Sequence, residues 1–241
     1  RVSSSEDLIA LAENIRSQLT LLTDASDNIH ALEEEISSET IIAQKLAAKL
    51  SSGRQKAAEM LRKIVEKSLS LMDMPAAKFV VNVQSSTELN PYGMDKITFL
   101  FSANNSLAPR SLAEVASGGE MSRVMLALKA LTSRQIQLPT IVFDEIDTGV
   151  SGKVASSMAQ IMGEMCKEAE QQVLAITHLP QIAAKADVHY FVYKEDVDGR
   201  TLTRIRELNS EQRITELAHM LSGSKVTDAA MENARQLLQD K

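Results

Sequence analysis

Residues 140–145 read Thr-Ile-Val-Phe-Asp-Glu, a short apolar run that ends in two carboxylates. A run of this length and composition predicts a buried β-strand at residues 140–144. A helical pattern from about residue 151 to residue 170 and a second apolar run at residues 173–177 follow it. A strand, a helix and a second buried strand in this order are typical of a parallel βαβ unit, so this part of the chain is predicted to be an α/β lobe.

Further elements are expected on both sides of this unit. Residues 90–93 and the pair Asp198-Gly199 each separate two strand-like runs and are predicted to be turns. The other predicted elements are strands at residues 79–83, 97–101, 188–193 and 202–207, and helices at residues 117–131 and from residue 211 onward.

The N-terminal region carries an apolar stripe with a seven-residue period, which over residues 8–50 is typical of a coiled coil. The period places Leu8, Ile15, Leu22, Ile29, Ile36, Ala43 and Leu50 at one position, and Leu11, Gln18, Ala25, Leu32, Glu39 and Leu46 at the other. Only Gln18 and Glu39 break the apolar stripe. Residues 51–53, Ser-Ser-Gly, interrupt the stripe, and Pro75 ends the helical spacing that resumes after them. We therefore predict a coiled-coil arm segment at residues 1–74 and the α/β lobe at residues 75–241. The alternative is a long amphipathic helix that packs on its own domain.

The distribution of charge limits the ways in which this chain could bind nucleic acid. Its formal net charge of -6 argues against binding through overall basicity. Among the charged residues, Asp and Glu outnumber Lys and Arg in residues 1–39, whereas Lys and Arg outnumber Asp and Glu in residues 45–67. The basic stretch, which includes Lys56, Arg62 and Lys63, is either a solvated helix face or a surface that contacts DNA phosphates.

Polar residues end both strands of the βαβ unit, at the sheet edge where α/β proteins bind ligands. Asp144 and Glu145 follow the first strand. This is the form of a Walker B strand, in which the Asp holds Mg²⁺ and the Glu activates water, although solvated acids also end many strands. His178 ends the second strand, and the parallel connection is expected to bring it beside Glu145.

Two glycine-containing segments accompany these residues. Residues 116–120, Ala-Ser-Gly-Gly-Glu, are predicted to begin a helix whose free N–H groups and dipole favour phosphate, with Ser117 as its cap. An ordinary helix cap is the alternative. Residues 147–152 form a glycine-rich turn directly after the acidic pair, and a plain loop is the alternative there.

In this order and spacing, the four segments resemble the signature loop, Walker B strand, D-loop and switch histidine of an ABC-type ATPase head. The arm that leads into the lobe narrows the resemblance to the SMC-like group, in which an arm separates the two halves of each head. The sequences at residues 50–58, 115–123, 143–152 and 176–183 closely resemble the RecN family of bacterial DNA repair ATPases.

The resemblance implies that this chain forms only part of an ATPase head. The sequence contains no Gly-x-x-x-x-Gly-Lys-Ser/Thr (Walker A) loop, which in this family lies in an N-terminal half before the outgoing arm. We therefore expect the C-terminal lobe of an ABC/SMC-type P-loop ATPase head, preceded by a long coiled-coil helix. The missing initiator Met fits a chain that begins partway through a longer protein. The expected partners are its own N-terminal half, a second head in an ATP-sandwiched homodimer, and double-stranded DNA or its ends.

The resemblance also implies residue roles in an intact protein that uses ATP and Mg²⁺ in recombinational repair of double-strand breaks. Asp144 would help hold Mg²⁺, Glu145 would be the general base and His178 would contact the γ-phosphate. Asp147 would link the two nucleotide sites across the dimer. The residues facing the nucleotide of the other head would be Ser117, Gly118, Gly119 and Glu120. Without the Walker A loop, the chain alone is expected to be inactive.

Two other interpretations remain. One is a coiled-coil dimerisation module without turnover, against which the four intact segments argue. The other is the C-terminal half of another SMC-like ATPase, such as a nuclease-associated one, which paired cysteines of a zinc hook would mark. The single Cys166 supplies no such pair, excludes a disulfide framework and fits a reducing cytosol. Since no apolar run approaches a membrane span, we expect no membrane contact. The resemblance implies a cytoplasmic, nucleoid-associated bacterial protein.

Overall fold

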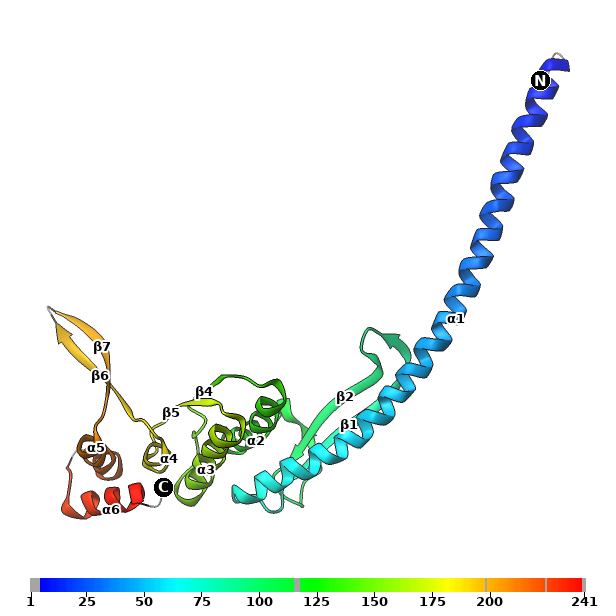
Figure 1. The fold of residues 1–241 in the computed structure, drawn as a ribbon. Coiled ribbons are helices and arrows are strands. Elements are labelled where there is room, and N and C mark those ends of the chain that lie inside the picture. Colours follow the sequence, from blue (N-terminus) through cyan, green and yellow to red (C-terminus); the bar gives the residue numbers. More distant parts are fainter. Residues whose placement is uncertain (1–4, 115–117, 198, 224, 240–241) are drawn as a thin grey trace. The chain divides into compact units, whose positions relative to one another are not determined.

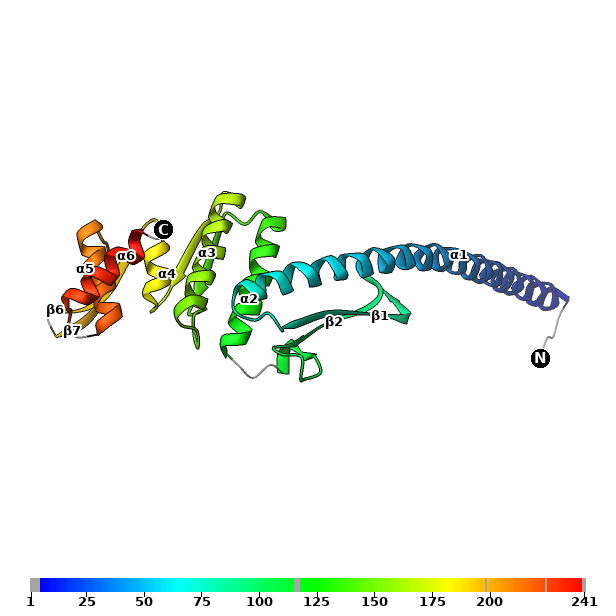
Figure 2. The ribbon, with the colours of Figure 1, turned by 90° about the horizontal axis from the view of Figure 1, so that it is seen from below.

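The computed structural model describes residues 5–114, 118–197, 199–223 and 225–239. Contacts between residues divide the chain into two units. The first unit comprises residues 1–58 and 82–97, and the second comprises residues 59–81 and 98–241. Figures 1 and 2 label their helices and strands in two views. The domain boundary predicted between residues 74 and 75 differs from this division and stays a prediction.

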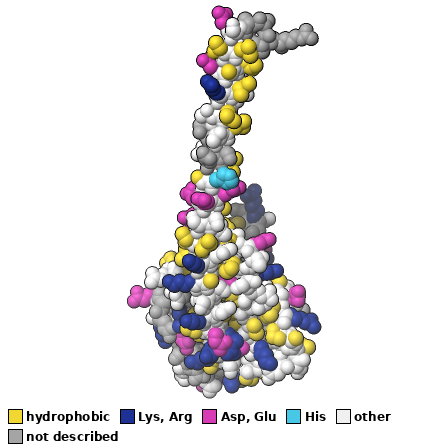
Figure 3. All heavy atoms as spheres, turned by 90° about the vertical axis from the view of Figure 1, so that its right-hand side faces the viewer, with side chains coloured by type: hydrophobic (Ala, Val, Ile, Leu, Met, Phe, Trp, Pro, Cys, Tyr) yellow, Lys and Arg dark blue, Asp and Glu magenta, His cyan; other side chains and the backbone are white. Residues whose placement is uncertain are grey.

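One long helix, α1 (Ser5–Leu71), supplies most of the first unit. It continues through Gly53, because a single glycine costs a helix only about 1 kcal/mol. Residues 51–53 therefore interrupt the apolar stripe without ending the helix. The described side chains of the stripe are exposed along this unit, as at Leu8, Leu22 and Ile36. Figure 3 shows hydrophobic side chains at the surface along this helix, which is what a coiled-coil helix presents where no partner covers it.

The first unit also contains the outer parts of two paired strands, β1 (Lys78–Asn90) and β2 (Gly93–Ser102). Arg54 of α1 fastens the tip of this hairpin to the helix. Its guanidinium donates to Asp95 Oδ2 at 3.0 Å and to the carbonyl oxygen of Tyr92 at 2.8 Å. The side chain of Asp95 is completely covered by these contacts. The tip of the hairpin is thus held on α1 by a charge-assisted hydrogen bond.

The second unit is built around β4 (Thr140–Asp144) and β5 (Gln172–Ile176), which pair in parallel with Asp144 opposite Ile176. The helices α2 (Gly118–Ile136) and α3 (Gly152–Ala169) lie on one face of this pair (Figures 1 and 2). Alternate residues of β4 point to this face, where Ile141 and Phe143 are buried. The strand, helix and strand that the sequence predicts are confirmed, with bounds that agree to within one or two residues.

A single hydrophobic core joins these elements to the end of α1. Val65, Leu69 and Met72 are completely buried in it, together with Phe79 of β1 and Val124 of α2. The inner ends of β1 and β2 belong to this core, and β2 also pairs with the short strand β3 (Arg110–Ser111), which leads into a 3-10 turn, η1 (Leu112–Glu114). The second unit therefore encloses the last turns of the same helix whose earlier turns are exposed.

The C-terminal part forms a smaller helical cluster of α4 (Pro180–Lys185), α5 (Ser210–Ser222) and α6 (Asp228–Gln239), packed largely through alanines. Arg213 of α5 donates to carbonyl oxygens within and just after the last turn of α4, those of Ala184 at 3.3 Å and Ala186 at 2.8 Å. Those carbonyls lack partners within their own helix, so this side chain caps it.

An antiparallel hairpin connects α4 to α5. It consists of β6 (Tyr190–Val197) and β7 (Arg200–Glu207), with Tyr190 opposite Glu207. It confirms the two strands predicted around the Asp198-Gly199 turn. None of the described helices combines the length and the apolar character that a bilayer crossing needs.

Candidate functional site

The acidic pair lies where the sequence predicts it, at the carboxyl end of β4. Both side chains are exposed. Asp144 is the last residue of the strand, and Glu145 leaves the extended conformation with φ of 48°. Non-glycine residues adopt this left-handed conformation at a cost and often at functional sites. Because Glu145 is outside the strand, the alternation that would separate adjacent side chains does not apply to it.

Hydrogen bonds fix the turn after Glu145. Its N–H donates to the carbonyl oxygen of Ile176 at 3.3 Å, which ties the turn to the end of β5. Its carbonyl oxygen accepts from the hydroxyl of Thr148 at 2.9 Å. The N–H of Val150 donates to the carbonyl oxygen of Asp147 at 3.1 Å. The acidic pair therefore lies next to a turn that is fixed by hydrogen bonds to the end of β5 and within residues 145–150.

Asp147 is the buried acid of the site, and it joins the turn to the predicted switch histidine. Its Oδ2 accepts from the hydroxyl of Thr177 and, at 3.2 Å, from the N–H of His178. The ring Nδ1 of His178 lies 3.4 Å from the same oxygen. The sequence predicts His178 at this edge of the sheet, but the contact between His178 and Asp147 was not predicted. The role predicted for Asp147 across a dimer stays a prediction.

Gly119 of the signature segment packs against the same turn. Ser117 lies outside the described residues, and Gly118 is exposed at the start of α2. Gly119 is buried against Gly149, and a Cβ on Gly119 would come within 2.8 Å of the carbonyl oxygen of Gly149. Only glycine fits such a contact. Glu120, in the first turn of α2, is half-buried.

Arg123 is a residue of this region that the sequence analysis did not select. Its Nε donates to the carbonyl oxygen of Gly119, and its Nη1 donates to that of Met72, both at 3.0 Å. The first turn of α2 is thereby tied to the residue that follows α1. The only sequence signal is an arginine one helical turn after the glycine pair, because Met72 lies 51 residues away.

The donors present suit magnesium bound together with a nucleotide. Among the described residues, no three His, Cys, Asp or Glu side chains are grouped so as to hold a metal ion by themselves. Mg²⁺ in nucleotide sites is usually held by one or two carboxylates plus phosphate oxygens and water. Asp144, exposed at the strand end, can supply such a carboxylate.

The three predicted DNA-contacting residues differ in their surroundings. Arg62 forms ion pairs with Glu59 at 2.6 Å and with Glu66 at 2.5 Å, and Lys63 lies 3.7 Å from Glu59. The hydrogen bond with Glu59 and the charge of Glu66 raise the pKa of Arg62 further above its ordinary value. Lys56 forms no ion pair within the described part of the chain. The spacings of three and four residues around Arg62 could have revealed these pairs in the sequence.

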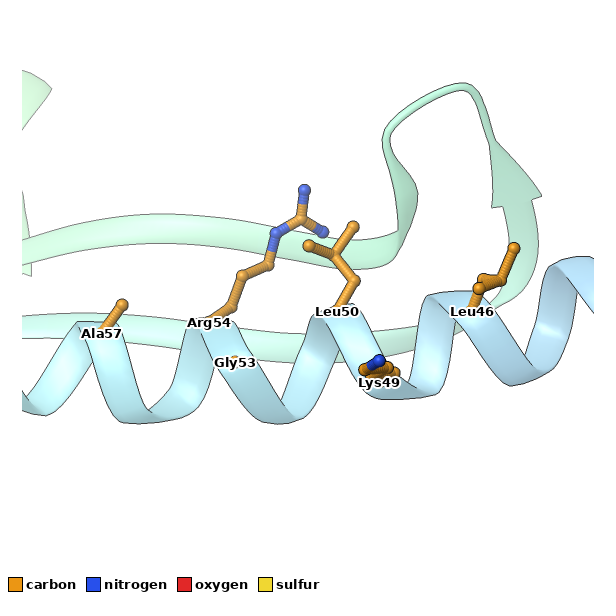
Figure 4. Close-up of a pocket in the computed structure, with 6 residues that line it drawn as sticks. All are labelled: Leu46, Lys49, Leu50, Gly53, Arg54 and Ala57. Atoms are coloured by element: carbon orange, nitrogen blue, oxygen red, sulfur yellow. The ribbon is translucent and has the colours of Figure 1, made fainter.

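An open groove of 490 Å³ lies along α1 in the first unit. It is lined by Leu46, Lys49, Leu50, Gly53, Arg54 and Ala57, and Figure 4 shows Leu46, Leu50 and Ala57 along one side of the helix. Leu46 and Leu50 belong to the heptad stripe, and Gly53 and Ala57 continue its spacing. The groove is therefore the small-residue end of the exposed apolar stripe.

Comparisons with known proteins give one consistent match. The chain is 35% identical over 97% of its length to the DNA repair protein RecN of Haemophilus influenzae, and equally to that of Bacillus subtilis. It spans only 42% and 43% of the lengths of these curated relatives and matches their C-terminal part. No family model matches the chain.

Solved structures support the fold. The chain resembles the Smc head domain with coiled coil and joint from Pyrococcus yayanosii, with a TM-score of 0.57 and 19% identity over 90% of this chain and 39% of that one. It also resembles the Smc head domain with an extended coiled coil from Pyrococcus furiosus, with a TM-score of 0.52 and 17% identity over 89% and 51% of the two chains. The predicted α/β fold of an SMC-type head with a long helix is confirmed.

Proposed function

Since the chain matches the C-terminal part of the DNA repair protein RecN over nearly all of its length, we propose that it is the C-terminal lobe and returning arm of an ATPase that acts in DNA double-strand break repair. One observation carries this proposal. The end of β4 brings Asp144 and Glu145 beside a turn whose Asp147 binds the segment of His178. An acidic pair and a histidine at one edge of a parallel sheet suit phosphoryl transfer from a nucleotide.

Each of these residues has a proposed task. Mg²⁺–ATP, when bound, supplies the phosphoryl group and the metal charge that neutralises it. Asp144 holds the metal, Glu145 accepts a proton from the attacking water, and His178 contacts the γ-phosphate. Ser117, Gly118, Gly119 and Glu120 face the nucleotide of a second head. Such a site works mainly by positioning and charge stabilisation.

The N-terminal half of the protein is the proposed partner of the β4–β5 sheet. In the described residues this parallel sheet has two strands, and its second face is bare: Val142 is 55%, Leu174 42% and Ile176 57% exposed. Parallel sheets are normally covered on both faces. We propose that the absent half, which brings the Walker A loop, covers this face and completes the head.

The outgoing arm is the proposed partner of α1. A heptad stripe of exposed Leu and Ile requires a second helix to bury it. The groove at Leu46, Leu50, Gly53 and Ala57 offers small residues where two helices can approach closely. DNA binding is proposed to be local, through the basic part of the same arm around Lys56, because the chain as a whole is acidic.

Reconstitution tests the proposed ATPase. The chain co-expressed with the N-terminal half of the same protein should hydrolyse ATP with Mg²⁺, and this chain alone should not. Glu145→Gln should abolish turnover in the complex while ATP and a dimer of heads persist, because only proton transfer is removed. Glu170→Gln is the matched control: Glu170 is an exposed glutamate with the same φ of 48°, away from the site, and it should leave turnover unchanged. Turnover by the chain alone, or normal turnover by the Glu145→Gln complex, would exclude this assignment.

A further inference from the structure

The carboxylate of Asp147 has a position that the proposed reaction does not explain. The side chain is completely buried, whereas both acids of the preceding pair are exposed. Its Oδ1 has no hydrogen-bond partner among the described residues. A buried carboxylate is costly to keep unless it serves an interaction that the fold needs. Every contact that the structure gives this side chain goes to Thr177 or His178.

These contacts leave the end of β5 little freedom. The hydroxyl of Thr177 donates to Asp147 Oδ2 and accepts from the N–H of Leu179 at 3.0 Å, so both of its hydrogen-bonding functions are used. The N–H of His178 donates to the same Oδ2, which fixes the backbone from which the ring projects. One carboxylate oxygen therefore sets the path of the chain just before α4.

The ring of His178 lies near the same oxygen. Its Nδ1 lies 3.4 Å from Asp147 Oδ2, while 69% of the side chain is exposed. A carboxylate can only accept, so a neutral ring that pairs with this oxygen carries its proton on Nδ1. Fixing one ring nitrogen determines which atom the ring presents on its other side. In His178 that atom is Nε2.

We propose that Asp147 is a positioning residue that acts through His178: it holds the ring with Nδ1–H directed inward and presents Nε2 to the nucleotide. This inference rests on the ATPase function proposed above. It gives Asp147 a task within its own lobe, distinct from the link between two nucleotide sites that the family resemblance implies. The burial of Asp147 behind Thr177 and His178 favours this assignment.

A double-mutant cycle in the reconstituted complex tests the proposal. Asp147→Asn should lower kcat for ATP by about 10- to 100-fold, the usual cost of losing a group that orients a functional histidine. The KM for ATP should change little, because binding groups remain. If Asp147 acts through the ring, the same substitution should add no further loss to His178→Ala. A further loss of kcat or of ATP-dependent head dimerisation in the double variant would overturn the proposal.

A measurement on the unsubstituted protein separates this inference from the ATPase assignment and does not depend on variants that fold. The ¹⁵N chemical shifts of the imidazole report which nitrogen carries the proton. In the complete protein at alkaline pH, the neutral ring of His178 should be protonated at Nδ1. Protonation at Nε2 alone would overturn the inference. A complex with the expected ring state that fails to hydrolyse ATP would instead refute the proposed function.

Discussion

The two ends of α1 carry similar apolar side chains and differ completely in their burial. In the second unit, Leu69 is 0% exposed in a core shared with β1 and α2, whereas in the first unit Leu22 is 69% exposed. The helical spacing of apolar residues makes both ends of α1 helical. Only the elements that surround a segment decide whether its apolar face is a folding core or a surface for another chain. The comparison predicts that equivalent substitutions in the two units have different effects.

Truncation of a leucine should show the largest difference. Leu69→Ala should lower the unfolding free energy by about 2–5 kcal/mol, because it leaves a cavity in a closed core. Leu22→Ala should change it by less than about 0.5 kcal/mol, because the side chain is already exposed. Urea unfolding of the chain measures both. Equal losses of unfolding free energy would mean that the exposed stripe already has a partner. In the presence of the outgoing arm, Leu22→Ala should lower the unfolding free energy more than it does in this chain alone.

Replacement of glycine by alanine should have opposite signs in the two units. Gly119→Ala places a Cβ 2.8 Å from the carbonyl oxygen of Gly149 and should cost about 1–3 kcal/mol. Gly53→Ala has open space around the new methyl group and should stabilise α1 by up to about 1 kcal/mol. Gly118→Ala, also in open space, controls for helix propensity at the start of α2. Thermal unfolding distinguishes the variants, and a neutral Gly119→Ala would contradict the close packing.

Neutralisation of a basic residue should affect DNA binding more at Lys56 in the first unit than at Arg62 in the second. Lys56→Gln should weaken binding and lower the slope of log K against log salt by about 1, as expected for one lost phosphate contact. Arg62→Gln should have a smaller effect, since Arg62 is already paired with Glu59 and Glu66. A salt titration with double-stranded DNA measures both slopes. Charge reversal at Lys56, Arg62 and Lys63 together with an unchanged slope would exclude this stretch as a DNA surface.

The smallest expected difference is in how two carboxylates, Asp95 and Glu59, contribute to the pH dependence of stability. A hydrogen bond from Ser51, together with that from Arg54, holds the pKa of Asp95 below its ordinary value of 3.8. As the pH falls, the carboxylate of Asp95 is therefore protonated at a higher pH in the unfolded chain than in the folded chain. The stability that Asp95 contributes is present above pH 3.8 and is lost as the pH falls through the lowered pKa. Asp95→Asn should flatten this acid dependence of unfolding. Glu59→Gln should hardly change it, because the exposed Arg62–Glu59 pair is screened by solvent; an equal effect would contradict the difference in burial.

The elements that could be predicted are those with a strong local signal. Residues 140–144 form the strand at the bounds that their apolar run indicates, and the two strands expected on either side of residues 198–199 pair with each other. Gly53 lies within α1 because packing and the length of the helix outweigh one weak position. The presence of His178 near the acidic pair also follows from a local rule, the parallel connection of β4 and β5.

The links between these elements could not be predicted. Asp147 meets Thr177 across 30 residues, and Arg123 meets Met72 across 51. Neither the spacing nor the residue types indicate these pairs, because side-chain hydrogen bonds between distant segments depend on how helices and strands pack. The left-handed conformation of Glu145 is equally nonlocal, since glutamate has no preference for it.

The sequence alone determined the helical arm with its heptad stripe, the parallel βαβ unit and the polar residues at its strand ends, because each depends on periodicity and on neighbours in the chain. Tertiary structure alone decided which part of the stripe is buried, which acid of the turn is exposed and which nitrogen of His178 faces its carboxylate. Those properties depend on what surrounds a side chain, and burial brings together residues that the sequence keeps far apart.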